Sequence, residues 1–184
     1  MSTKDFTSQE LQEISVIKGM IESVYLPSIN KVLGVELIKM DGIIIAGGMF
    51  TSLITHHKIK DIDVFLLANP VLKGFVEDRI GKSFVKGDSD YLGNPMIEDV
   101  YVEKGSNVPI QFIFTKYRTR EELIKHFDYK HCCISYDVLA QKLFVSPYNY
   151  ACAKQKKLIV NNLTNIKPYR EDKFLRKGFV KEAL

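Results

Sequence analysis

The sequence lacks tryptophan and also lacks any apolar run of membrane-spanning length, which would be about 18 or more uninterrupted residues. Its first ten residues, MSTKDFTSQE, include charged residues and have no apolar core, so they do not favour a secretory signal. We therefore expect no membrane partner, and we expect the chain to work in the cytoplasm.

Cysteine is scarce as well, with only Cys132, Cys133 and Cys152 present. Their number is odd, two are adjacent, and no C-x-x-C spacing occurs, which argues against a disulfide framework and a zinc site. A reducing compartment fits this usage best. No neighbour of Cys132 in the sequence would activate it, so a buried thiol is favoured over a nucleophile.

Apolar residues make up 46% of the 184 residues, enough to bury the core of one ordinary domain. We expect a main domain over residues 1–150 and a basic arm over residues 151–184. Positions 154–184 hold nine Lys or Arg and three Asp or Glu, a local charge of +6 in a chain of net charge +4. Such a tail fits contact with a polyphosphate or nucleic acid, and it equally fits a solvated basic helix.

Hydrophobic periodicity predicts an α+β chain that begins with a long helix. Ser8 is the candidate N-cap, the helix extends to Val35, and Pro27 is expected to break or kink it. The pattern then predicts a strand at 42–46, a glycine turn at 47–48, a short helix at 49–57, a strand at 62–67, a helix near 71–80 followed by loops or a hairpin to 105, a strand at 108–115, a helix at 119–126, an edge strand at 127–135, helical spacing from 137, and a charged helix or arm at 169–184.

The stretch at 42–67 carries the chemistry. A buried strand ends at Gly47 and Gly48, a short helical pattern follows, and a second strand opens with Asp61 and Asp63 flanking an isoleucine. Side chains alternate across a strand, so the two aspartates are expected on one face. This order brings a phosphate-sized gap and two carboxylates to the same end of a small sheet.

Two carboxylates on one face suit Mg²⁺, which is usually held by one or two carboxylates together with substrate phosphates. Two such ions about 4 Å apart can activate a hydroxyl and stabilise a leaving pyrophosphate. Glycines let the backbone approach a phosphate, and the following helix offers N–H groups at its positive end. Lys60 adjoins the acidic pair and could offset its repulsion, and an ordinary solvated lysine at this position is equally possible. The candidate ligands of the triphosphate are Gly47, Gly48, Thr51, Ser52 and Lys60.

The segment from Gly47 to Asp63 resembles the signature of the DNA polymerase β-like nucleotidyltransferase superfamily, and more narrowly the head domain of poly(A) polymerases and CCA-adding tRNA nucleotidyltransferases. A second block, FDYKHCCISYD at 127–137, resembles the family's block R-D-F-T-I-N-A. The basic segment 170–179, which closes on RKGF, is similar to the ends of small phage-encoded members. The resemblance as a whole covers about residues 43–137, half of the chain.

This resemblance implies a nucleotidyltransferase fold: a small mixed sheet flanked by helices, with an N-terminal helix and a basic helical C-terminal arm. It implies that Asp61 and Asp63 bind the metal and act in catalysis with Asp128, which lies beside the sugar or serves as a third carboxylate. The implied cofactor is Mg²⁺ or Mn²⁺, the implied substrate is an NTP, and the implied acceptor is RNA or a protein.

Three positions depart from the family's pattern. Met49 and Phe50 stand where CCA-adding enzymes carry an arginine after the glycine pair, and His126 stands in place of an arginine before Asp128. Gln111 occupies the place of a third carboxylate. The length also leaves no room for the helical body that holds tRNA in those enzymes, so CCA addition to tRNA is not expected.

The sequence therefore favours a metal-dependent nucleotidyltransferase that moves an NMP from an NTP to an acceptor hydroxyl, by positioning and electrostatic stabilisation. Two alternatives stay open. One is a catalytically degenerate protein of this fold, acting as a nucleic-acid- or partner-binding module, phage-encoded or virion-associated. The other is a minimal nucleotidyltransferase that modifies a protein partner. A viral source would place the chain in the host cytoplasm or the virion.

Overall fold

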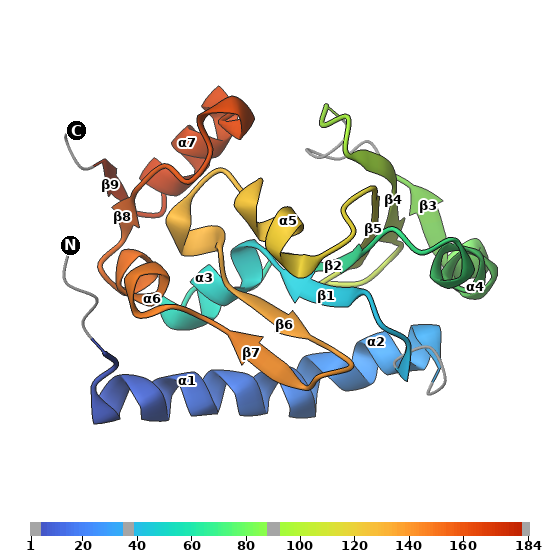
Figure 1. Cartoon of the computed structure of the whole chain (residues 1–184), viewed down its shortest axis with the longest axis horizontal. Helices are drawn as coiled ribbons and strands as arrows, with labels where there is room; N and C mark the ends of the chain where they lie inside the picture. Colours follow the sequence, from blue (N-terminus) through green and yellow to red (C-terminus); the bar gives the residue numbers. More distant parts are fainter. Residues whose placement is uncertain (1–4, 35–38, 88–92, 182–184) are drawn as a thin grey trace.

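The computed structural model describes residues 5–34, 39–87 and 93–181. Helices flank one central mixed sheet (Figure 1). The α-helices are α1 (Ser8–Met20), α2 (Leu26–Leu33), α3 (Gly48–Ile54), α4 (Pro70–Ile80), α5 (Arg120–Lys125), α6 (Pro147–Lys154) and α7 (Pro168–Leu175). The strands are β1 (Ile43–Ala46), β2 (Ile62–Leu66), β3 (Phe84–Lys86), β4 (Ile97–Glu103), β5 (Ile110–Thr115), β6 (Ser135–Asp137), β7 (Lys142–Phe144), β8 (Lys157–Leu158) and β9 (Val180–Lys181). A π-helix, η1 (Ile21–Tyr25), and three 3₁₀ segments, η3 (Gly81–Ser83), η4 (Lys130–Cys132) and η5 (Leu163–Asn165), complete them.

The central sheet has the strand order β3-β4-β5-β2-β1-β6-β7. Strands β2 and β5 run parallel, and every other neighbouring pair in this sheet is antiparallel. The register places Asp63 opposite Ala46 of β1 on one side and beside Gln111 of β5 on the other. The strand that carries the aspartate is thus paired on both edges, which fixes its position.

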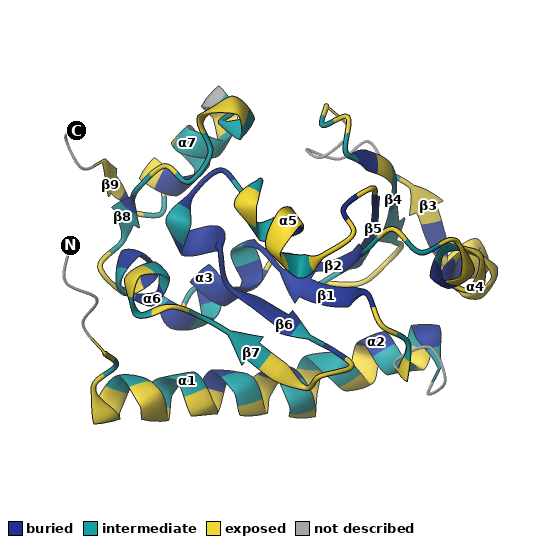
Figure 2. Ribbon diagram, in the orientation of Figure 1, coloured by how far each residue is buried: buried dark blue, intermediate teal, exposed yellow. Residues whose placement is uncertain are grey.

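The two faces of the sheet are covered by different helices. One face packs against the N-terminal helix, α3, α4 and α6 in the larger core, which includes Ile45 and Val64. The opposite face forms a smaller core that includes Ile44, Phe65 and Leu123 of α5. Figure 2 shows the central strands buried, while α1 and α4 expose their outer sides. Successive side chains of β1 and β2 therefore point alternately into the two cores. Asp63 lies on the same face of the sheet as Phe65.

The N-terminal helix begins at Ser8 as predicted, but its N-cap is Thr7 rather than Ser8, and Thr7 forms a capping box with Glu10. Pro27 does not break it. The π-helix η1 precedes the proline, and the backbone N–H of Leu26 donates to the Ile21 carbonyl five residues back. A π-turn shifts the hydrogen-bond pattern just before the residue that has no N–H to donate. Val35 lies outside the described residues.

The predicted strands at the centre, the helix near 71–80, the following hairpin and the helix at 119–126 are confirmed. The predicted edge strand at 127–135 is wrong. This segment forms a turn and the 3₁₀ helix η4, with one isolated bridge between Tyr129 and Val160. Strand β6 follows it and lies between β1 and β7, not at an edge. The helical spacing predicted from 137 is interrupted by β7 and β8.

The C-terminal arm packs back on η4. Phe174 of α7 and Phe179 each place their ring centroid 4.4 Å from that of His131, and Tyr129 contacts the edge of Phe174. These side chains form a third small core with Cys132 and Leu158. The predicted helix at the C-terminal end is confirmed for α7, while residues 182–184 lie outside the described part. Within the described ranges, no helix combines the length and apolarity that a membrane span requires.

Candidate active site

The glycine turn and the second aspartate lie against each other. Gly47 is the N-cap of α3 with φ +93°, a left-handed conformation that favours glycine. A Cβ built on it would lie 2.9 Å from Oδ2 of Asp63, closer than real Cβ contacts allow. The carboxylate of Asp63 therefore occupies space that a side chain at position 47 would need. Of the two glycines, Gly48 faces no such limit, because a Cβ there would meet nothing within 4 Å.

Asp61 lies just before β2, two positions from Asp63. The alternation of side chains along an extended chain would direct both carboxylates to the same side. Asp61 is partly exposed and Asp63 is buried. One lysine of the arm lies within electrostatic range of Asp61. Burial and the charges of Lys173 and Lys60 lower the pKa of Lys177, and Asp61 opposes this shift. The arm thus brings Lys177 toward Asp61, which Lys60 precedes in the sequence.

A pocket of about 430 Å³ opens on the Phe65 face of the sheet, a volume in the range of small-molecule sites. Gly47 and Asp128 both line it, so the structure brings the glycine turn and the third predicted acid to one cavity. Aromatic and apolar side chains form much of its wall, and asparagines and basic groups of the arm close one side. The lining includes Phe65, Asn94, Met96, Tyr117, His126, Phe127, Asn165, Lys167 and Arg170.

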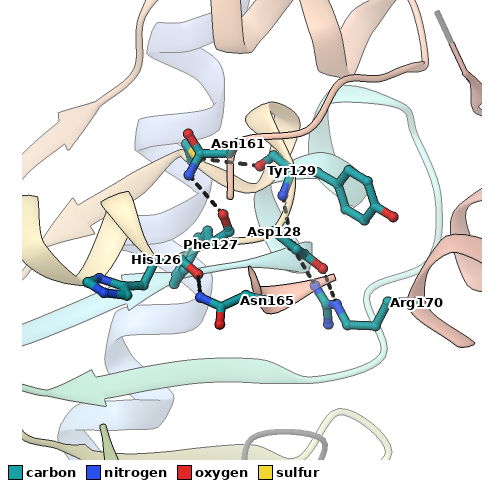
Figure 3. A network of polar contacts seen from close by, with 8 residues as sticks. His126, Phe127, Asp128, Tyr129, Asn161, Asn165 and Arg170 are labelled. Atoms are coloured by element: carbon teal, nitrogen blue, oxygen red, sulfur yellow. Dashed lines mark hydrogen bonds and ion pairs between the residues drawn. The ribbon is translucent and has the colours of Figure 1, made fainter. Parts of the chain in front are cut away.

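Asp128 is 5% exposed and does not stand alone (Figure 3). The Arg170 guanidinium donates from Nε to Oδ2 and from Nη2 to Oδ1, the latter at 3.3 Å. The backbone N–H of Tyr129 also donates to Oδ1, at 3.0 Å. The carboxylate is therefore part of a buried ion pair at the pocket wall, an arrangement that differs from that of a third metal-binding carboxylate.

The two hydroxyls predicted to bind the triphosphate have other surroundings. Thr51 is buried, and its hydroxyl donates to the carbonyl of His131 at 3.1 Å, which ties α3 to η4. Ser52 is buried and lines a different groove, between α1 and the end of α3. Helix α3 also has only seven residues, so its dipole is short. The structure thus places Gly47 beside Asp63 and gives these two hydroxyls other surroundings.

Two reactive residue types near the pocket are inert. Burial raises the pKa of Cys132, and the nearby Asp128 adds to this shift, so the thiol stays protonated. His131 is fully buried, and its burial, with the charges of Arg170 and Lys177, lowers its pKa to about 3. The buried thiol predicted for Cys132 is confirmed. Neither side chain is suited to nucleophilic or acid–base work at neutral pH.

The donor set at the aspartates fits a hard divalent cation that also binds substrate. Asp61 and Asp63 offer carboxylate oxygens, and Mg²⁺ needs only one or two of these when phosphates supply further ligands. The bare backbone at Gly47 lets the Asp63 carboxylate lie against the turn, in space that a Cβ would fill. Among the residues that the structure describes, no group of three or more His, Cys, Asp or Glu side chains forms a self-sufficient metal site.

Sequence reasoning did not assign the arm residues that reach the site. In the sequence, Arg170 is only the first residue of the basic segment 170–179, and no motif includes Asn161 or Asn165. The signal present in the sequence was the cluster of asparagines at 161–165, a residue type that often bonds backbone groups in turns. Nothing in the sequence states which backbone groups these side chains meet.

Residues 16–156 match the sequence profile of the Gabija anti-defense 2 family. The chain belongs to this family. The matched residues include the glycine turn, Asp61, Asp63 and Asp128, and they end at residue 156, before the helix α7 that carries Arg170. No curated protein sequence matches this family member.

Solved structures similar to this Gabija anti-defense 2 family member are CCA-adding enzymes. A CCA-adding enzyme in complex with ATP aligns with a TM-score of 0.63 at 15% identity, over 89% of this chain and 42% of that chain. The Bacillus stearothermophilus CCA-adding enzyme in complex with CTP gives 0.58 at 18%, over 85% and 41%. The Thermotoga maritima CCA-adding enzyme complexed with tRNA gives 0.57 at 17%, over 83% and 37%.

This family member therefore spans about two fifths of the length of these enzymes. At such identities the likeness shows the fold alone, and the fold is the nucleotidyltransferase fold of the CCA-adding enzymes. The predicted fold class, a mixed sheet flanked by helices, is confirmed.

Proposed function

We propose that this chain is a metal-dependent nucleotidyltransferase that transfers an NMP from an NTP to an acceptor hydroxyl of RNA or a protein. We further propose that this activity serves the anti-defense role that the family's description names, in the cytoplasm of a host cell invaded by a phage. The observation that carries the proposal is the contact between Gly47 and the carboxylate of Asp63 at a pocket of about 430 Å³.

The surroundings of the Gly47–Asp63 contact offer one region suited to the triphosphate of an NTP and another suited to its base. The aspartate side suits a polyphosphate chain and its counterion, because Lys177 interacts with Asp61 and with the charges of Lys60 and Lys173. The pocket side presents Phe65, Phe127 and Tyr117, whose rings suit a flat nucleobase. Asp128, between them in the pocket wall, is the proposed contact of the sugar.

The reaction needs little covalent chemistry from the protein. The acceptor hydroxyl oxygen bonds to the α-phosphorus, the bond from that phosphorus to the oxygen bridging to the β-phosphate breaks, and pyrophosphate leaves with that electron pair. The hydroxyl proton passes to a carboxylate or to water. Asp61 and Asp63 would hold Mg²⁺ or Mn²⁺, which supplies Lewis-acid stabilisation of the phosphate oxygens when bound. Gly47 and Gly48 keep the backbone open to the phosphates, and the pocket orients the nucleoside.

The likeness to enzymes solved with ATP and with CTP supports an NTP as the substrate class. The acceptor of the T. maritima relative, tRNA, is a property of that protein. For this chain we propose a smaller acceptor site, either an RNA end or a hydroxyl-bearing side chain of a protein partner. The basic arm favours an acidic or nucleic-acid surface.

A second candidate is a catalytically degenerate protein that binds a partner and transfers nothing. Gln111 favours it, because the register places this neutral amide directly beside Asp63, where a third carboxylate would complete a fuller metal site. Such a protein would keep the fold and the pocket but would not catalyse nucleotidyl transfer. This candidate predicts that NTP binding, if retained, leads to no product.

Incubation with NTPs labelled at the α-phosphate, Mg²⁺ and fractionated cell RNA or protein separates these functions. We expect label in one acceptor fraction with wild-type protein and none with Asp63→Asn. The same NTPs labelled at the γ-phosphate serve as the matched control, because nucleotidyl transfer releases that label as pyrophosphate. Label from the γ-position in the acceptor, or none from the α-position in any fraction, would contradict nucleotidyl transfer.

A further inference from the structure

Arg170 is one of the groups that the C-terminal arm contributes to the pocket wall. It reaches from α7 to Asp128, and its side chain is 17% exposed while that of Asp128 is 6% exposed. Two guanidinium nitrogens bond the two carboxylate oxygens, which fixes the plane of the carboxylate as well as its charge. The three donors on this carboxylate leave capacity for about one more, since an ionised carboxylate accepts about four hydrogen bonds.

The backbone around Asp128 is held by the same part of the chain (Figure 3). The backbone N–H groups of Asn161 and Asn162 donate to the Asp128 carbonyl at 2.7 and 3.1 Å. The side chain of Asn161 donates to the carbonyl of Phe127 at 2.8 Å, and that of Asn165 donates to the carbonyl of His126. The carbonyls of three consecutive residues are therefore bonded by one asparagine-rich segment.

The arm that carries Arg170 is anchored on the segment it holds. Phe174, one turn further along α7, packs on His131 and Tyr129, and the guanidinium of Arg170 lies 5.6 Å from the centroid of the Phe174 ring. The arginine thus comes from a packed helix, and the position of its guanidinium follows from the position of that helix. A change in the arm would move the Asp128 carboxylate.

Stability alone does not account for this ion pair. Removing two charges from water costs about as much as their attraction returns, and apolar side chains of similar size often stabilise a protein equally well. The pair lies in the wall of a ligand-sized pocket that Gly47 also lines, and there the orientation of a carboxylate affects what binds.

We propose that Arg170 is a positioning residue of the nucleotide pocket: it holds the Asp128 carboxylate in the one orientation that binds the nucleoside. The arm at 161–179 is thereby part of the binding site, although the residues matched to the family end at 156. This inference rests on the proposed function, because it assigns the ligand of the pocket to a nucleotide.

The test compares Arg170→Gln, Asp128→Asn and the double variant, each titrated calorimetrically with Mg²⁺ and the four common ribonucleoside triphosphates. Each single change should weaken nucleotide binding by about tenfold to a hundredfold, as for other residues that orient a ligand-binding group. Each should also lower the thermal midpoint, because it leaves one buried charge unpaired. The double variant replaces the pair with two amides that can bond each other, so it should recover the midpoint without recovering the affinity.

Recovery of both properties in the double variant would overturn the proposal, since the pair would then serve the fold alone. Wild-type affinity in Arg170→Gln would overturn it as well. If that variant fails to fold, Arg170→Lys keeps the charge but loses the paired geometry, and it should show a partial loss of affinity; wild-type affinity there overturns the proposal. The exposed Arg176 supplies the matched control, because Arg176→Gln changes the same charge on the end of the same helix.

Failure of the proposed function gives a different pattern. A wild-type protein that binds none of the four triphosphates overturns the nucleotidyltransferase proposal, and this inference with it. A wild-type protein that binds one of them, with Arg170→Gln binding equally well, overturns this inference alone.

Discussion

Adding one methyl group to Gly47 would displace the carboxylate of Asp63 from its observed position. Gly47 combines a left-handed backbone with the close approach of a carboxylate, so two independent physical reasons exclude any other residue there. Gly48 meets neither condition. The fold therefore requires glycine at position 47, whereas it would also accept other residues at position 48.

Gly47→Ala should destabilise the protein by about 1–3 kcal/mol, because alanine is strained at this φ and its Cβ would press on the Asp63 carboxylate. Gly48→Ala should leave the free energy of unfolding unchanged or raise it by about 0.4–1 kcal/mol, through a less flexible unfolded chain. Urea unfolding of the two variants measures the difference. Equal destabilisation of both would contradict the contact between Gly47 and Asp63.

The aspartates and the glycine turn could be found from the sequence because they lie in one short segment whose strand and turn patterns are local. The surroundings of Thr51 and Ser52 could not, because the direction of a side chain on a short helix depends on what packs against it. Here η4 takes the Thr51 hydroxyl, and α1 lies beside the groove at Ser52. The pairing of Asp128 with Arg170 joins positions 42 residues apart, and no local pattern specifies it.

Among the secondary-structure elements, the segment at 127–135 shows where a hydrophobic pattern misleads. Its apolar residues suggested a strand, but Tyr129 and Cys132 are buried against the arm, in a turn and in the 3₁₀ helix η4. The carbonyl of Asp128 bonds Asn161 and Asn162 instead of a neighbouring strand. A contact between distant elements therefore decides the local structure, which the local sequence could not indicate. The long N-terminal helix was predictable because its period is sustained over many turns.

The packing of η4 on α7 predicts a pH dependence through His131. Its folded pKa is lowered to about 3 from an ordinary 6.5, so between these values the unfolded chain binds more protons than the folded one. Stability should therefore fall as the pH falls through this window, by at most about 1.4 kcal/mol per pH unit.

His131→Phe keeps an aromatic ring among Phe174, Phe179 and Tyr129 and removes the titration. Urea unfolding of both proteins at pH 7, 6, 5 and 4 should show the wild type losing stability faster than the variant. Carboxylates common to both proteins cancel in the comparison. Parallel losses would show that His131 is not held neutral in the folded state.

For the molecule as a whole, the sheet order explains why residues from four separate segments meet. Strands β1 and β2 lie side by side at its centre and bring Gly47 to Asp63, while β6 on the other edge of β1 follows directly after the segment that holds Asp128. The arm then crosses back over that segment and supplies Arg170 and Lys177. Fold class followed from the sequence through the order strand, glycine turn, helix, strand. The crossing of the arm did not, because it depends on packing among Tyr129, His131 and Phe174.

The most direct test of the central claim is a calorimetric titration of the wild-type chain and of Asp61→Asn/Asp63→Asn with each ribonucleoside triphosphate, with Mg²⁺ and with a chelator. The wild type should bind at least one triphosphate in a manner that requires Mg²⁺. The variant should keep its far-ultraviolet circular dichroism and lose the metal-dependent part of the binding. Mg²⁺-dependent binding of unchanged strength in the folded variant would contradict the assignment of these aspartates.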